Sequence, residues 1–263
     1  MKKILLVAIT IVLTINCLQA QDDRPVRLAF AIQPAISWIA PKGDILTNEG
    51  NRFGFSYGIL TDFRIAGNPN YAFSTGIFIN SQGGTLTNNQ FHDGKTLSPD
   101  LSDAPDALID AFAETAEEKY KIQYLDIPLT LKLKTNEIGY LTYYGQFGLD
   151  LSFNLKATKD VDYKFDGISA PLTIEDQDVN KDINAIRTAL QVGGGVEYNI
   201  SGETYILAGI VWNNGLTNIF NHEEVKADDD GTPRLISDGT ALSFGEKFEA
   251  VNNYIGLTLA VIF

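Results

Sequence analysis

The residues best able to perform nucleophilic catalysis are few and form no recognisable pattern. The chain has two histidines, His92 and His222. A hydrolytic site needs a nucleophile, a histidine and a carboxylate placed together. Ser81 or Ser243 with His222 and Glu223 is the combination that the sequence offers, but no characteristic spacing marks it. We therefore predict no catalytic residues and a protein that is not an enzyme.

One acidic stretch resembles the first half of a calcium loop, with an oxygen ligand at every second position. The four candidate ligands are Asp176, Asp178, Asn180 and Asp182. Lys181 stands where a glycine is expected, and Arg187 stands where the bidentate glutamate should be. These residues are weak calcium candidates, and we predict that the chain has no metal site and no cofactor.

Most of the chain alternates apolar and polar residues with a period of two, which is the pattern of half-buried strands. The clearest segment is 141–155, where Phe147, Leu149 and Leu151 share one face and Asp150 and Ser152 share the other. The pattern predicts strands at about 26–39, 53–65, 71–81, 125–133, 141–155, 183–199, 204–219 and 254–263. The strand at 204–219 is apolar on both faces, so its orientation stays open.

Short and long connections alternate along the chain between these strands. The short ones, 67–70, 136–139 and 201–203, are rich in Gly, Asn, Pro and Ser. The long ones cover about 40–51, 82–119, 156–182 and 220–247. Outer-membrane barrels have an even number of strands, short periplasmic turns and long extracellular loops. We predict an all-β transmembrane antiparallel up-and-down β-barrel of eight strands, with both termini in the periplasm.

The loop at 82–119 is expected to contain a short amphipathic helix. Asp103 is a suitable cap, Pro105 suits the first turn, and Leu108, Ile109 and Phe112 share one helical stripe. Such a helix would cover the mouth of the barrel or dock a partner.

The two faces of the predicted strands decide what lies inside. An eight-stranded barrel has just enough room for side chains, so the face of small and charged residues must point inward and the bulky apolar face must meet lipid. The predicted interior charges are Arg27, Asp62, Arg64, Asp126, Lys132, Asp150, Arg187 and Glu197. Because their signs are mixed, they can pair and fill the lumen as a salt-bridged core and not a pore.

The first twenty residues have the features of a secretory signal peptide. Lys2 and Lys3 precede an apolar run that is too short to span a bilayer, and Ala20 is a small residue at the predicted cleavage site. An alternative is a lipoprotein signal with Cys17 as the lipid anchor. We expect residues 1–20 to be cleaved and residues 21–263 to form one barrel domain. Loss of both lysines changes the net charge from −13 to −15, which excludes nucleic acid as a partner.

Four motifs resemble the PorT-like outer-membrane β-barrel family of Bacteroidota, whose architecture is of the OmpA/OmpX type. They are YLDIPL at 124–129 followed by Lys132, GGGVEY at 193–198, GLTNI at 215–219 and YIGLTL at 254–259. The resemblance implies an outer-membrane barrel in a Gram-negative bacterium. It also implies that Phe263 is read by the barrel-insertion machinery, and that a role in protein secretion is one candidate activity.

Two non-enzymatic hypotheses follow for the function of such a barrel. In the first, it is a structural or accessory subunit that binds another envelope protein. In the second, it is a stand-alone binder or narrow conduit for a small solute. Paired interior charges would favour the first, and unpaired ones the second. A third hypothesis, a membrane-embedded lipid hydrolase or acyltransferase, needs a nucleophile and a base together near the outer rim.

Overall fold

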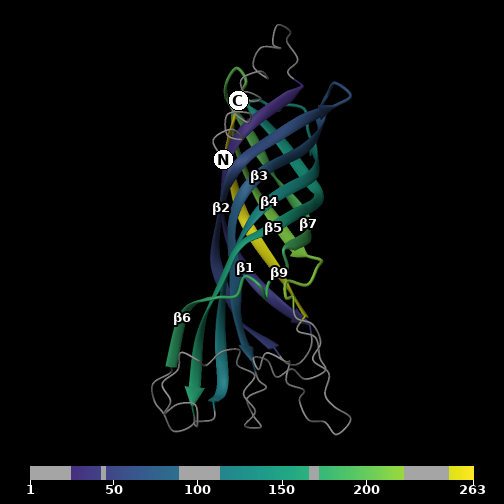
Figure 1. Cartoon of the computed structure of the whole chain (residues 1–263). Coiled ribbons are helices and arrows are strands. Elements are labelled where there is room, and N and C mark those ends of the chain that lie inside the picture. Colours follow the sequence, from purple (N-terminus) through teal and green to yellow (C-terminus); the bar gives the residue numbers. More distant parts are fainter. Residues whose placement is uncertain (1–24, 43–45, 89–112, 166–171, 222–248) are drawn as a thin grey trace, which may run out of the picture.

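Nine antiparallel β-strands make up most of the described chain in this computed structural model (Figure 1). The structure describes residues 25–42, 46–88, 113–165, 172–221 and 249–263. The strands are β1 (Val26–Lys42), β2 (Leu46–Ile65), β3 (Asn68–Asn88), β4 (Ala113–Lys134), β5 (Leu141–Phe165), β6 (Leu172–Asp178), β7 (Ile186–Ser201), β8 (Thr204–Gly215) and β9 (Glu249–Ile262). Within these ranges, no helix is long and apolar enough to cross a membrane.

The sheet closes into a ring. Each strand pairs with the next in the order β4, β3, β2, β1, β9, β8, β7 and β5, and pairing of β4 with β5 completes the circle. β6 lies outside this circle and pairs with β5 alone among the described strands. Closure removes the free edges that a flat sheet would expose, so the fold is an all-β closed barrel with one added strand.

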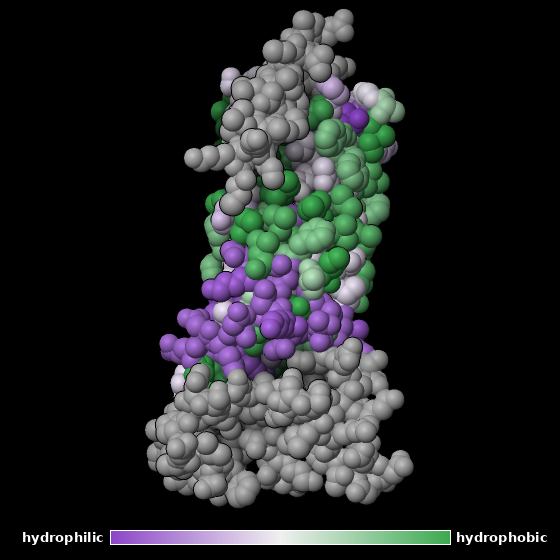
Figure 2. Space-filling model, viewed as in Figure 1, coloured by the Kyte–Doolittle hydropathy of each residue, from purple (hydrophilic) through white to green (hydrophobic). Residues whose placement is uncertain are grey.

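Side-chain alternation places bulky apolar residues on the outer wall. Phe30, Ile77 and Ile210 are more than half exposed, whereas Ala31 and Leu207 face inward and are buried. Figure 2 shows this wall as a broad hydrophobic band, bordered by a hydrophilic band on the side of β6. The orientation of β8, which the sequence left open, is now defined. Leu207 and Val211 point into the barrel, and Ile206, Ile210 and Trp212 point outward.

The two ends of the barrel differ. At the turn end, defined by Ala66, Gly67, Gly139 and Gly202, the strands are joined by tight connections whose φ values are 52°, 69°, 69° and 56°. Positive φ is accessible to glycine at little cost, which explains the residue type at three of these positions. The C-terminal residue Phe263 lies at the same end, where its backbone exchanges hydrogen bonds with Leu28. The opposite end is called the loop end.

Several predicted loops are shorter than expected, because strands extend into them. The predicted loop at 40–51 is mostly β1 and β2, and the loop at 82–119 loses residues at both sides to β3 and β4. The stretch 156–182 contains the end of β5 and all of β6, so the sheet has nine strands, of which eight form the ring and β6 lies beside it. The predicted helix after Pro105 and most of the loop at 220–247 lie outside the described residues.

A β-bulge explains why the extension of β5 was not recognised. The register of β4 against β5 shifts between Gln123 paired with Lys156 and Tyr124 paired with Asn154, which leaves Leu155 as the extra residue. Below the bulge odd-numbered residues of β5 face outward, whereas beyond it Ala157, Lys159 and Val161 are buried. The outward face there is polar because it has left the apolar band, and the alternation seen at 141–155 is interrupted.

Candidate functional site

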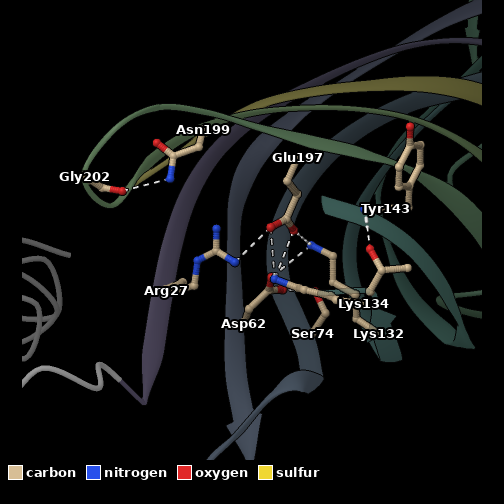
Figure 3. Close-up of polar contacts among 10 residues, drawn as sticks. Arg27, Asp62, Ser74, Lys132, Lys134, Tyr143, Glu197, Asn199 and Gly202 are labelled. Carbon is tan, nitrogen blue, oxygen red and sulfur yellow. Dashed lines mark hydrogen bonds and ion pairs between the residues drawn. The ribbon is translucent and has the colours of Figure 1, made fainter. Parts of the chain in front are cut away.

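Five charged side chains meet inside the barrel near the turn end, and we call them the charge cluster (Figure 3). They are Arg27 of β1, Asp62 of β2, Lys132 and Lys134 of β4, and Glu197 of β7. They converge because each stands at an inward position near the turn end of its strand.

Lys132 lies at the centre of the charge cluster. Its Nζ is 2.9 Å from Asp62 Oδ2 and 2.9 Å from Glu197 Oε1. Lys134 Nζ is 3.0 Å from Glu197 Oε1, and Arg27 Nη1 donates to Glu197 Oε2 at 2.9 Å. Ser74 Oγ donates to the other oxygen of Asp62. Because Lys132, Asp62 and Glu197 are nearly inaccessible to solvent, each charge depends on these partners for stabilisation.

A second polar group, the Arg187 group, lies further along the lumen. The guanidinium of Arg187 donates to Ser152 Oγ at 3.1 Å, to the carbonyl of Asn252 at 2.8 Å and to the side chain of Asn213. Asn213 Nδ2 in turn donates to Asp150 Oδ2 at 2.9 Å. Strands β5, β7, β8 and β9 are thus joined through buried side chains.

An apolar layer fills the lumen at the loop end. The strands contribute Ile39, Leu86, Tyr120, Ile122, Tyr124, Ala157 and Ala250, and the connecting segments contribute Val179, Ile183, Ile219 and Phe220. The connecting segments are held in place by backbone hydrogen bonds from Ile219 to Ala250 and from Asn184 to Ile219. The charge cluster, the Arg187 group and this apolar layer follow one another from the turn end to the loop end.

Seven of the eight predicted interior charges lie in two groups inside the barrel, and Arg64 lies apart from both. The charge cluster contains Arg27, Asp62, Lys132 and Glu197, while Asp126, Asp150 and Arg187 lie in the middle of the barrel. Arg64 is half-buried and lines a cavity of about 220 Å³ at the turn end.

Sequence reasoning missed several polar partners of these charges. Lys134 shares the inward face of Lys132, and this spacing was visible in the sequence. Asn80, Asn213 and Asn252 also belong to the polar interior. No sequence pattern indicates which charge each asparagine would contact, because the partners lie on different strands.

Beyond the apolar band, β4, β5 and β6 form a projection that we call the finger (residues 117–123, 156–162 and 173–178). Figure 1 shows it at the loop end. Its outer face carries ion pairs of 2.7 Å between Lys119 and Asp162 and between Lys121 and Asp160. The hydrogen bond to Asp162 raises the pKa of Lys119, so this lysine remains charged at neutral pH. The finger presents a hydrated, charged surface.

Three of the four calcium candidates make side-chain contacts with other protein groups. Asp176 Oδ1 is 3.6 Å from Lys121 Nζ, Asp178 Oδ1 accepts the backbone N–H of Asn180, and Asn180 Oδ1 accepts from Asn154. Within the described ranges, no three Asp, Glu, His or Cys side chains form a group that could hold a metal ion.

The remaining sequence candidates are Phe263 and the hydrolytic combination. Phe263 is half-exposed on the wall, with its ring 5.7 Å from that of Phe30. Ser81 lies in β3. His92, His222, Glu223 and Ser243 lie outside the described residues, as do residues 1–20.

One protein-family model agrees with this architecture. The family model described as outer membrane protein beta-barrel domain matches residues 19–222. No curated protein matches the chain. Among solved structures, Neisserial surface protein A is 11% identical with a TM-score of 0.40, over 92% of this chain and 98% of that one. A major outer membrane protein from Thermus thermophilus is 12% identical with a TM-score of 0.42, over 90% of this chain and 99% of that one.

Proposed function

Because this chain belongs to the outer membrane protein β-barrel domain family and is therefore an outer-membrane protein, we propose that it is a sealed, non-enzymatic barrel that serves as an accessory subunit for another envelope protein. The observation that carries this proposal is the filled lumen. Interior charges are paired at 2.9 Å around Lys132, and an apolar layer containing Tyr120 and Phe220 packs across the loop end. A conduit would need hydrated, separated charges along its length.

The finger is the part of the molecule best suited to bind a partner. It stands clear of the apolar band, and its outer face carries both signs of charge at Lys119, Lys121, Asp160 and Asp162. Charges at the rim of an interface set the association rate and the choice of partner. The exposed acidic and polar residues of β6, such as Thr173 and Glu175, extend this surface.

The position of the chain in the envelope is part of the same proposal. We place the turn end in the periplasm and the loop end outside the cell, with the ring of β1–β5 and β7–β9 as the membrane wall. Residues 1–20 act as the cleaved signal peptide, and Phe263 is read by the insertion machinery. The four motifs of the PorT-like resemblance lie in β4, in β7, around the end of β8 and in β9, and we propose membership of that Bacteroidota group.

Conductance measurements test whether the lumen is sealed. The full-length mature protein is reconstituted into a planar lipid bilayer in concentrated KCl, with a known porin as the positive control. We expect no stepwise current from the barrel, because both the charge cluster and the apolar layer block the lumen. Regular conductance steps would contradict the sealed barrel and favour the solute conduit.

Site-specific photocrosslinking in native membranes tests the accessory role. A photoreactive residue replaces Thr173 on β6, and the matched control replaces Ile77, which is 59% exposed on the apolar wall. We expect a reproducible protein adduct from position 173 and none from position 77. If position 173 gives no protein adduct in growing cells, the finger does not bind an envelope partner.

A further inference from the structure

A small cavity lies in the middle of the barrel, between the charge cluster and the apolar layer. Its volume is about 40 Å³, and its polar lining includes Gln33, Ser56, Asp126, Gln146, Asp150 and Tyr254. None of the described residues that line it is a lysine or an arginine. The two aspartates are therefore the charged groups of this lining.

Each of the two aspartates has one buried carboxylate oxygen that makes no hydrogen bond within the described part of the chain. Asn80 donates to Asp126 Oδ2, and Asn213 donates to Asp150 Oδ2 at 2.9 Å. Neither Oδ1 atom has a hydrogen-bond partner within the described part of the chain. The exposed fractions are 4% for Asp126 and 1% for Asp150, so bulk water does not solvate these oxygens. A buried, unpaired carboxylate oxygen is costly unless a ligand satisfies it.

The charges around the cavity do not balance. Arg187 is the nearest cation, with Nη1 4.0 Å from Asp150 Oδ2, and its other contacts are neutral groups. Lys132 forms ion pairs with Asp62 and Glu197 in the charge cluster. Two carboxylates thus face one guanidinium, so with both carboxylates ionised one negative charge has to be balanced by a proton or by a bound cation.

We propose that this cavity binds a hard monovalent cation such as Na⁺, held by Asp126 Oδ1 and Asp150 Oδ1. Hard cations select carboxylate, amide and hydroxyl oxygens, and Gln146, Ser56 and Tyr254 supply neutral oxygens in the same lining. One positive charge cancels the single excess negative charge. A water needs about 10–15 Å³ of such volume, so the cavity has room for the cation and a water that accepts from the unpartnered Nε2 of Gln33.

Thermal unfolding in detergent micelles tests the site without an assumed activity. The full-length mature barrel is titrated with NaCl, KCl or CaCl₂ against choline chloride at equal ionic strength. We expect a saturable rise in Tm of about 5 °C with Na⁺, because the cation binds the folded state alone. Asp126→Asn should abolish this rise, whereas Asp160→Asn, which removes a carboxylate from the finger, should keep it.

Three results would overturn the cation site. They are an equal Tm in NaCl and choline chloride, a Na⁺ response retained by Asp126→Asn, and a response to Ca²⁺ with none to Na⁺. Crystals of the unaltered protein grown with Tl⁺ in place of Na⁺ give an independent measurement if the variant fails to fold. An anomalous peak between Asp126 and Asp150 would support the proposal, and a cavity with ordered water but no anomalous peak would refute it.

Discussion

Lys132 is fully buried between Asp62 and Glu197, and its Nζ lies 2.9 Å from an oxygen of each. Lys132→Met keeps most of the length of the side chain but removes the charge, which leaves two buried carboxylates with fewer cationic partners. We expect a loss of about 3 kcal/mol in the free energy of unfolding, limited because Lys134 also contacts both carboxylates. Urea unfolding in lipid vesicles, followed by tryptophan fluorescence, measures this loss.

The control for this prediction is Lys119→Met on the finger. Lys119 is also ion-paired, at 2.7 Å from Asp162, but its side chain is 44% exposed. Exposed pairs contribute at most about 1 kcal/mol. Equal losses in both variants would show that burial does not set the contribution of the charge cluster.

Gly209 allows Tyr144 to lie across the inner wall. A Cβ at position 209 would come 2.1 Å from the hydroxyl oxygen of Tyr144 and 2.9 Å from the carbonyl of Gly194. Gly209→Ala should therefore reduce the free energy of unfolding by about 2 kcal/mol. Because the closer atom belongs to a side chain, the penalty should shrink in a Tyr144→Leu background. A double-mutant cycle in urea measures this coupling.

The matched control for this cycle is Gly58→Ala. Its Cβ would meet the carbonyl oxygen of Ile77 at 2.1 Å, and no side-chain change relieves a contact with backbone. An equal Gly209→Ala penalty with Tyr144 and with Leu at position 144 would contradict the proposed contact.

Individual inward positions could be predicted from alternation, but individual contacts could not. Asp126 and Lys132 lie an even number of positions apart on one strand, so the alternation of side chains places both in the lumen. That Lys132 contacts Asp62 while Asp126 contacts Asn80 depends on the register of β2, β3 and β4. Register is set by pairing across the closed ring, which a single sequence does not record.

At the scale of elements, β6 is held to the barrel through β5, the one described strand with which it pairs. The backbone N–H of Asp176 donates to Asp160 Oδ1 at 3.0 Å, at the position where Asp176 has a φ of 53°. Asp160→Ala removes this hydrogen bond and the pair with Lys121. We expect faster amide exchange throughout β6 with unchanged exchange in β7 and β8, measured by hydrogen–deuterium exchange and mass spectrometry. Lys156→Gln, an exposed change on the same strand, should leave β6 protected.

The same attachment should depend on pH. Burial would raise the pKa of Asp160, but the N–H of Asp176 and the ammonium group of Lys121 outweigh it and hold the pKa below its ordinary value. The stabilisation is therefore present above the unfolded-state pKa of about 3.9 and is lost as the pH falls through the lower folded-state pKa. Protection factors of β6 that do not change between neutral pH and a pH below that folded-state pKa would contradict this prediction.

Elements inside the apolar band were predictable, whereas those beyond it were not. In β5, residues 141–155 keep bulky side chains outward because lipid surrounds them, and this requirement produces a clear pattern. After Leu155 the outward positions are Lys156, Asp160 and Asp162, which resemble a solvated loop. Hydrogen bonds to β4 and β6 make this segment a strand, and sequence polarity does not reveal them.

At the scale of the whole molecule, the hydrophobic band and the finger require opposite surroundings. Trp212 lies on β8 and is 42% exposed within the apolar wall, whereas Thr173 is exposed on β6 in the finger. Figure 2 shows the hydrophobic band and the hydrophilic band as separate zones along the barrel. The chain has two tryptophans, so Trp38→Phe leaves Trp212 as the single fluorophore. In vesicles with brominated acyl chains, its fluorescence should be strongly quenched.

The matched protein carries Thr173→Trp in a Trp38→Phe and Trp212→Phe background, and its fluorescence should be insensitive to bromine. Bromine quenches only a tryptophan that touches acyl chains. Quenching at Trp212 without quenching at position 173 therefore indicates that the ring lies in lipid and the finger lies in water. Quenching at position 173 would mean that the finger lies in the bilayer. An unquenched Trp212 would mean that the exposed aromatic residues of the wall do not touch acyl chains, which would contradict the proposed orientation in the membrane.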